Sequence, residues 1–166
     1  MNIELINRMK SFLNSEEFKF KIKTIVEDKA VAINNSRDSV VVSEDLNFNS
    51  DLINKFVIYC KEFLSIDKSV KINLVSSKEG YSFKTLAYYI IGDHESFIYC
   101  KNRALVDCLR SLAHELVHNC QDYEGRIDSK QIGETNDGVP IENEANAKAG
   151  EIIRIFGREY PEIYDI

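Results

Sequence analysis

The sequence predicts an α+β fold in which a small antiparallel sheet lies between helical segments. Apolar residues recur at helical spacing over residues 50–64, 102–123 and 141–160, whereas residues 70–100 hold three short stretches with strand-like patterns. Helices and strands are therefore grouped along the chain rather than alternating, which is typical of α+β proteins. The chain has 166 residues, of which 44% are hydrophobic. This length and composition predict a single domain over residues 1–166.

The first quarter of the chain is expected to form N-terminal helices, followed by a short strand. Ile3, Ile6 and Met9 recur at helical spacing. Residues 18–26 begin with an alternating pattern that fits either a helix or a strand. The β-branched run Val40–Val42 favours a short strand.

The next predicted helix covers residues 50–64. Asn49 or Ser50 can cap its N-terminus, because a short polar side chain can accept hydrogen bonds from free backbone N–H groups there. Seven apolar residues follow at helical spacing and form one stripe: Leu52, Ile53, Phe56, Val57, Cys60, Phe63 and Leu64. We expect this stripe to face the core.

Three predicted strands follow this helix. Val70, Ile72 and Leu74 alternate with polar residues, and the run Leu86–Ile91 is rich in aromatic and β-branched residues. A Gly-Asp turn then leads into Ser96–Cys100. We expect these strands to form the antiparallel sheet.

Two helices complete the predicted fold. The first runs from Asn102, a plausible cap, to about Tyr123, and Gly125 is placed to end it. A polar segment rich in glycine and proline follows, and the second helix runs from Ile141 to about Tyr160. Alanines and a glycine in this second helix allow a close approach to a neighbouring helix.

Composition excludes several classes of protein. The net charge is -6, so binding of nucleic acid through a broad basic face is not expected. The longest apolar run, Leu86–Ile91, is far shorter than the ~18 residues of a membrane span, and the N-terminus carries charges where a signal peptide would be apolar. The four cysteines form no C-x-x-C pair, which favours reduced thiols and a cytoplasmic location.

The most informative motif is H-E-x-x-H, formed by His114, Glu115 and His118 within the predicted helix 102–123. Histidines at i and i+4 project from the same face of a helix about one turn apart, so both rings can bind one Zn²⁺. Glu115 lies at the edge of that face, where its carboxylate can deprotonate a metal-activated water without binding the metal. We therefore predict a zinc site with Glu115 as catalytic base.

A catalytic zinc needs a third protein ligand, and the following helix offers Glu142 and Glu144. With Glu142 toward the metal, Asn146 at i+4 lies on the same face and can support a ligating histidine. With Glu144 toward the metal, the residue at i+4 is Lys148, whose positive charge would lie unfavourably close to the metal cation. Glu142 is therefore preferred, Glu144 remains an alternative, and Glu124 is a more distant one.

These motifs resemble those of the gluzincin zinc metallopeptidases. H-E-x-x-H followed about two dozen residues later by E-x-E-A-N-x-x-A is similar to minimal single-domain gluzincins and to ImmA/IrrE-type proteases, and the resemblance covers roughly residues 86–156. It implies that His114, His118 and Glu142 bind the zinc and that Glu115 is the base. It also implies that the strand Ser96–Cys100 binds an extended peptide as an added strand.

The sequence thus leads us to expect a zinc metallopeptidase that hydrolyses peptides or proteins, with no nucleic-acid or membrane partner. The alternative is a catalytically silent protein that binds zinc for structure or for partner recognition, and a zinc hydrolase acting on another substrate is a third option. Gluzincins commonly use a Tyr or His to stabilise the oxyanion. Five residues are candidates for that role: Tyr88, Tyr89, Tyr99, Tyr123 and His94.

Overall fold

A computed structural model of the protein describes residues 38–81, 85–127 and 140–165. The chain divides into two units at Arg37, and the described residues belong to the second unit. The expected N-terminal helices lie outside the described residues, as does most of the polar segment before Ile141. The single-domain assignment over residues 1–166 therefore stays a prediction.

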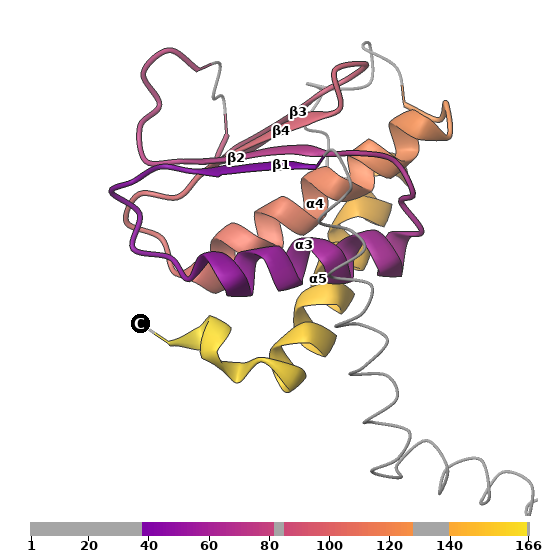
Figure 1. The fold of residues 1–166 in the computed structure, drawn as a ribbon. Coiled ribbons are helices and arrows are strands. Elements are labelled where there is room, and N and C mark those ends of the chain that lie inside the picture. The colour runs from indigo at the N-terminus through magenta and orange to yellow at the C-terminus, as the bar shows by residue number, and fades with distance from the viewer. Residues whose placement is uncertain (1–37, 82–84, 128–139, 166) are drawn as a thin grey trace, which may run out of the picture. The chain divides into compact units, whose positions relative to one another are not determined.

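The described unit has an α+β fold, as predicted, built on a four-stranded sheet with the order β1-β2-β4-β3 (Figure 1). The strands are β1 (Ser39–Val42), β2 (Lys71–Val75), β3 (Ala87–Ile90) and β4 (Glu95–Tyr99). All four lie within one or two residues of their predicted positions, and the strand favoured at Val40–Val42 is confirmed as β1.

The prediction of a wholly antiparallel sheet is wrong, because the sheet is mixed. β3 and β4 form the expected antiparallel hairpin, but β2 pairs in parallel with both β1 and β4. The chain leaves β2, forms β3 at the edge of the sheet and returns through β4 between them. A period-two pattern identifies a strand but does not indicate which neighbour it pairs with or in which direction.

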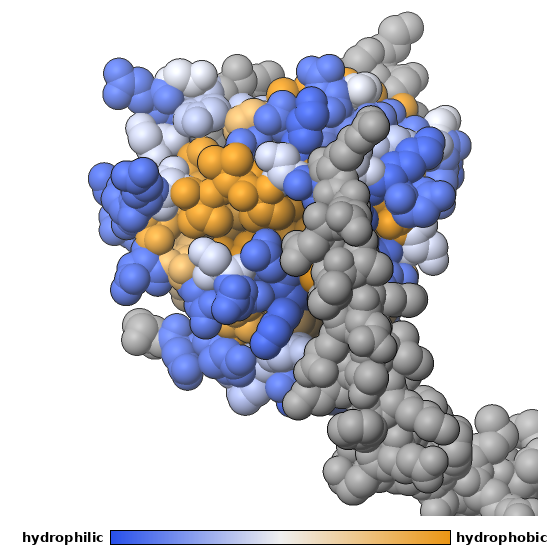
Figure 2. Space-filling model, viewed as in Figure 1, coloured by the Kyte–Doolittle hydropathy of each residue, from blue (hydrophilic) through white to orange (hydrophobic). Residues whose placement is uncertain are grey.

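In the described part of the chain, three α-helices lie on one face of the sheet (Figure 1). They are α3 (Ser50–Leu64), α4 (Leu105–Tyr123) and α5 (Pro140–Glu159), and a short 3₁₀ turn, η1 (Pro161–Tyr164), follows α5. The apolar stripes of these helices and one face of the sheet form a single core, except that Phe63 of the α3 stripe is exposed. On the side of the molecule drawn in Figure 2, one hydrophobic area remains visible among hydrophilic residues. None of the described helices is long and apolar enough to cross a bilayer.

The ends of the helices are only partly as predicted. Asn49 caps α3, because its side chain accepts hydrogen bonds from the backbone N–H groups of Asp51 and Leu52. The assignment of Asn102 as the cap of α4 is wrong. Asn102 has a φ of 60° and lies in a turn, and Ala104 occupies the cap position without a side-chain bond.

Gly125 ends α4 as predicted. Its φ of 66° lies in the left-handed region, which glycine adopts without a steric cost. The N–H of Arg126 donates to the carbonyl of Gln121, and the N–H of Gly125 donates to that of Asp122. This pair of bonds is the Schellman arrangement, which satisfies the last carbonyls of a helix.

A buried ion pair joins the start of the described chain to α3. The Lys61 ammonium lies 2.7 and 2.8 Å from the two carboxylate oxygens of Asp38, and both side chains are largely buried. One of these oxygens also accepts a hydrogen bond from the Val70 N–H. The pair thereby ties α3 to the ends of β1 and β2.

We expect Asp38→Ala to lower the free energy of unfolding by about 3 kcal/mol, because it leaves a buried ammonium without its counter-charge. Chemical denaturation measures this loss. Asp45→Ala is the control, since Asp45 is an exposed acid of the same type, and it should change stability by less than about 0.5 kcal/mol. Equal effects of the two substitutions would contradict the role given to the ion pair.

Candidate metal centre

Three side chains that the sequence nominates as ligands meet between α4 and α5. The Nε2 atoms of His114 and His118 are 3.0 Å apart, and the Glu142 carboxylate oxygens lie 3.2 Å from the first and 3.4 Å from the second. Within the described residues these three form a group that could hold a metal ion. A tetrahedral Zn²⁺ with bonds of about 2.0–2.1 Å places neighbouring ligand atoms roughly 3.3 Å apart, so the spacing fits such an ion.

The packing of the two helices sets this arrangement. On α4, Leu109, Leu112 and Leu116 are fully buried in the core, which turns the histidines toward α5. On α5, Ala145 and Ala149 are buried, and their small side chains let the helices approach closely. The first turn of α5 thereby brings Glu142 within reach of both imidazoles.

Gln121 fixes the tautomer of His118. The Gln121 amide nitrogen donates to the carbonyl of Ile141 and to the Glu144 carboxylate, at 3.1 Å each, so its oxygen faces His118. That oxygen lies 2.8 Å from His118 Nδ1 and accepts its proton. Nε2 of His118 therefore presents a lone pair to the centre of the cluster, as a metal ligand must.

Glu144, the alternative third ligand, points away from the two histidines. Its carboxylate is 2.7 Å from both the Arg126 guanidinium and the Lys148 ammonium. The hydrogen bonds from Arg126 and then Lys148 lower the pKa of Glu144 to about 2. Glu124 is also bound by Arg126, at 2.6 Å from Nε. Neither carboxylate belongs to the cluster.

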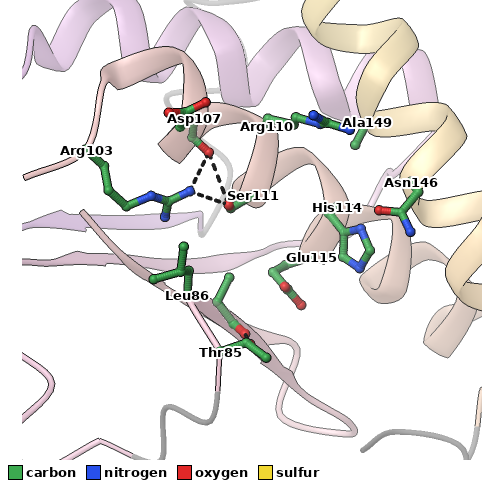
Figure 3. Close-up of a pocket in the computed structure, with 11 residues that line it drawn as sticks. Thr85, Leu86, Arg103, Asp107, Arg110, Ser111, His114, Glu115, Asn146 and Ala149 are labelled. Carbon is green, nitrogen blue, oxygen red and sulfur yellow. Dashed lines mark hydrogen bonds between the residues drawn. The ribbon is translucent and has the colours of Figure 1, made fainter. Parts of the chain in front are cut away.

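Asn146, one turn after Glu142, lies beside His114, and Figure 3 shows the two side chains facing each other. Burial, followed by the proximity of His118, lowers the pKa of His114 and favours the neutral imidazole that binds metals.

We expect Asn146→Ala to weaken zinc binding about tenfold, because outer partners orient a ligating histidine. Competition with a chromophoric chelator measures the affinity. Asn143→Ala on the exposed face of the same helix is the matched control and should bind zinc like the wild type. An unchanged affinity in Asn146→Ala would show that Asn146 does not orient His114 for metal binding.

Glu115 lies beside the cluster on the side that faces the sheet. Its side chain is nearly buried but borders a pocket of about 630 Å³, together with His114 (Figure 3). Burial and then the nearby Glu142 carboxylate raise the pKa of Glu115 to about 8. A carboxyl group whose pKa lies near neutrality can both accept and return a proton.

The residues nominated for oxyanion stabilisation do not line this pocket. The Tyr89 hydroxyl donates to Asp122 and lies 2.8 Å from His94 Nδ1, and the His94 ring stacks on Tyr123. The Tyr123 hydroxyl donates to a backbone carbonyl before β2. These contacts join the β3–β4 turn to the end of α4.

Tyr88 and Tyr99, the other two candidates, have their own neighbours. Tyr88 stacks on Phe97, and Tyr99 lies beneath the Lys78 ammonium. Neither of these two contacts involves His114 or Glu115.

The strand expected to receive an added peptide is not at the edge of the sheet. Ser96–Cys100 corresponds to β4, which pairs with β2 on one side and β3 on the other, so its backbone groups are already used. Among the described strands, β3 forms the edge near the pocket, and the segment Thr85–Ala87 forms one wall of the pocket. The expectation that β4 accepts an added strand is therefore wrong.

Two arginines of the pocket were not identified from the sequence. Arg103 and Arg110 line it together with Asp107 and Ser111. A sequence signal was available for Arg110, because residues 107, 110, 111 and 114 share one helical stripe when the spacing is extended back from His114. Arg103 precedes α4 and lies outside this stripe.

Compared with protein-family models, curated proteins and solved structures, the chain shows no match. The resemblance to gluzincins therefore rests on its sequence motifs.

Proposed function

We propose that the protein is a zinc-dependent metallopeptidase of minimal gluzincin type. The observation that carries the proposal is the cluster of His114, His118 and Glu142, with Glu115 next to it on the same helix and a pocket alongside. A site that binds metal for structure alone has no use for a buried carboxylate at that position. The proposal thus depends on Glu115 as much as on the ligands.

Zinc is the metal that we infer for this cluster. Two imidazoles and one carboxylate, with a fourth position left for water or substrate, form a common ligand set of catalytic zinc sites. When bound there, Zn²⁺ supplies Lewis acidity that activates water and polarises a carbonyl group. A divalent cation near Glu115 also favours its ionised form, which opposes the effect of burial on its pKa.

Glu115 has two roles in the proposed reaction. As general base, its carboxylate accepts the proton of the attacking water. As general acid, the resulting carboxyl group donates that proton to the leaving amine. The low exposure of Glu115 keeps bulk water from competing for the proton.

The free edge of β3 is the proposed docking site for the peptide. The Tyr99 N–H donates to the Leu86 carbonyl, so the alternation of an antiparallel pair directs the N–H and C=O groups of Ala87 away from β4. The Thr85 hydroxyl donates to the outward-facing Ala87 carbonyl. An extended peptide would add to these outward groups as a further strand.

One observation favours the silent metal-binding alternative. None of the predicted oxyanion stabilisers borders the pocket, and no Tyr is among the described residues that line it. This alternative predicts bound metal and no turnover.

Metal analysis of the purified protein, combined with peptidase profiling on a peptide library, tests the proposal. We expect about one zinc per chain, cleavage that a chelator abolishes, and recovery on adding Zn²⁺. Zinc-loaded protein that cleaves no peptide would favour the silent alternative or a hydrolase with another substrate. Protein that neither retains nor binds zinc would contradict the metal site itself.

A further inference from the structure

The pocket beside the candidate metal centre has a basic end. It extends from His114 and Glu115 along the N-terminal half of α4, between Thr85–Ala87 on one side and α5 on the other. Figure 3 shows Arg103 on the side of Leu86 and Arg110 pointing toward α5. The two guanidinium groups therefore flank the space that leads away from the metal centre.

Arg103 is held in place by neutral oxygens. Its Nη1 donates to the Tyr99 carbonyl at 2.7 Å, and its Nη2 donates to the Asp107 carbonyl and the Ser111 hydroxyl, at 2.8 Å each. These bonds use three of the five N–H donors of a guanidinium group. No ion pair of Arg103 with a carboxylate occurs among the described residues, so its position is fixed while its charge is not neutralised.

Arg110 is exposed, and within the described ranges it forms no hydrogen bond or ion pair. It lies four residues before His114, which is about 6 Å along the helix axis. Ser111, to which Arg103 is bonded, is three residues before His114, or about 4.5 Å. An extended peptide advances about 3.3 Å per residue, so the helix positions of Arg110 and Ser111 lie one to two peptide residues before that of His114.

The pocket also holds one opposing charge away from the centre. Asp107 is among the lining residues, and its carboxylate forms no ion pair with either arginine in the described part of the chain. Two positive charges therefore face one negative charge. This balance favours an anionic group on the bound molecule.

We propose that this pocket selects substrates with a carboxylate one or two residues from the cleaved bond, and that Arg103 and Arg110 bind it. The carboxylate is an Asp or Glu side chain or the C-terminus of the peptide. The remaining N–H donors of Arg103 supply directed hydrogen bonds, and Arg110 supplies a mobile second charge. This inference rests on the proposed function, because it locates the carboxylate relative to a bond at the metal.

Binding of peptide hydroxamates tests the inference without requiring turnover. The hydroxamate group anchors each probe at the metal, and the next two positions carry Glu, its neutral isostere Gln, or Lys. Calorimetry on the zinc-loaded wild type should show the Glu probe binding about fivefold tighter than the Gln probe, the size expected for a partly exposed ion pair. The Lys probe should bind weakest. The ratio of Glu-probe affinity to Gln-probe affinity should fall as salt is added.

Substitutions of Arg103 and Arg110 test whether these two residues cause the preference for the Glu probe. Arg110→Gln should reduce the ratio of Glu to Gln affinity, Arg110→Glu should favour the Lys probe, and Asp107→Asn should raise the ratio. Arg103→Gln should also reduce this ratio, but it removes the hydrogen bonds that Arg103 makes to its neighbours as well. Arg110 makes no such bonds among the described residues, so its substitution tests the charge alone. Arg154→Gln, an exposed arginine of α5 outside the pocket lining, is the matched control and should leave the ratio unchanged.

The binding results distinguish failure of the carboxylate-site proposal from failure of the metallopeptidase proposal. Equal affinity for the Glu and Gln probes in the wild type, or a ratio that neither arginine substitution changes, overturns the carboxylate site and leaves the metallopeptidase proposal standing. Zinc-loaded protein that binds no hydroxamate at all shows that the metal has no open position, and both proposals are then wrong.

Discussion

Glu142→Ala is expected to release zinc, whereas Glu144→Ala should retain most of it. Glu142 is 3.2 and 3.4 Å from the two histidine nitrogens, so its loss removes one of three proposed ligands. The affinity should therefore fall by more than the 10- to 100-fold that the loss of an outer partner costs. Glu144 instead binds Arg126, Lys148 and Gln121. Its loss acts through the orientation of His118 and should cost at most about tenfold.

Chelator competition on both variants, with metal content measured by plasma mass spectrometry, makes this comparison. His114→Ala and His118→Ala should also lose the metal. Circular dichroism checks that each variant is folded, because a general loss of structure would release zinc as well. A larger loss in Glu144→Ala than in Glu142→Ala would transfer the ligand role to Glu144.

The helical part of the fold is largely predictable from the sequence. Apolar residues on α3 and α4 repeat at helical spacing over four or five turns, so the pattern is long enough to identify both elements and their buried faces. Within α4 the same periodicity places His114 and His118 on one face. The histidine pair could therefore be recognised before its surroundings were known.

The topology of the sheet could not be predicted in this way. Strand pairing depends on long-range contacts, such as that between Ile72 of β2 and Ser96 of β4, which a local pattern does not contain. The resemblance to gluzincins implies peptide binding at β4, which lies inside the sheet, whereas the edge strand next to β4 is β3.

The preference for Glu142 over Glu144 came from the fourth residue after each. Asn146 and Lys148 indicated which carboxylate could share its face with a metal, and in the structure Lys148 forms an ion pair with Glu144. The contribution of Arg126 could not be anticipated, because it follows the end of α4 and reaches Glu144 across the interface with α5. Local helical geometry was therefore sufficient to rank the two residues, but the full environment of Glu144 required the tertiary structure.

Glu115→Gln is expected to reduce peptide hydrolysis by at least ~10²-fold and to leave zinc binding near the wild-type level. The amide retains the size and hydrogen-bonding reach of the carboxylate but cannot accept a proton, and a general base commonly contributes 10²–10⁴-fold. Glu115 is not a member of the ligand cluster, so the metal should stay. Because the Glu115 carboxyl group is nearly buried and has a raised pKa, its neutral replacement should not destabilise the fold.

The decisive assay compares the wild type and Glu115→Gln on one cleaved peptide, with zinc measured on the same samples. Glu151→Gln, which changes an exposed glutamate on α5, is the control and should keep full activity. A rate loss with zinc retained separates a chemical role for Glu115 from a structural one. Equal rates in the two proteins would show that Glu115 is not the base and that the cleavage arises from a contaminant or another mechanism. Loss of zinc in Glu115→Gln would instead make the carboxylate part of the metal site, which its position beside the ligand cluster argues against.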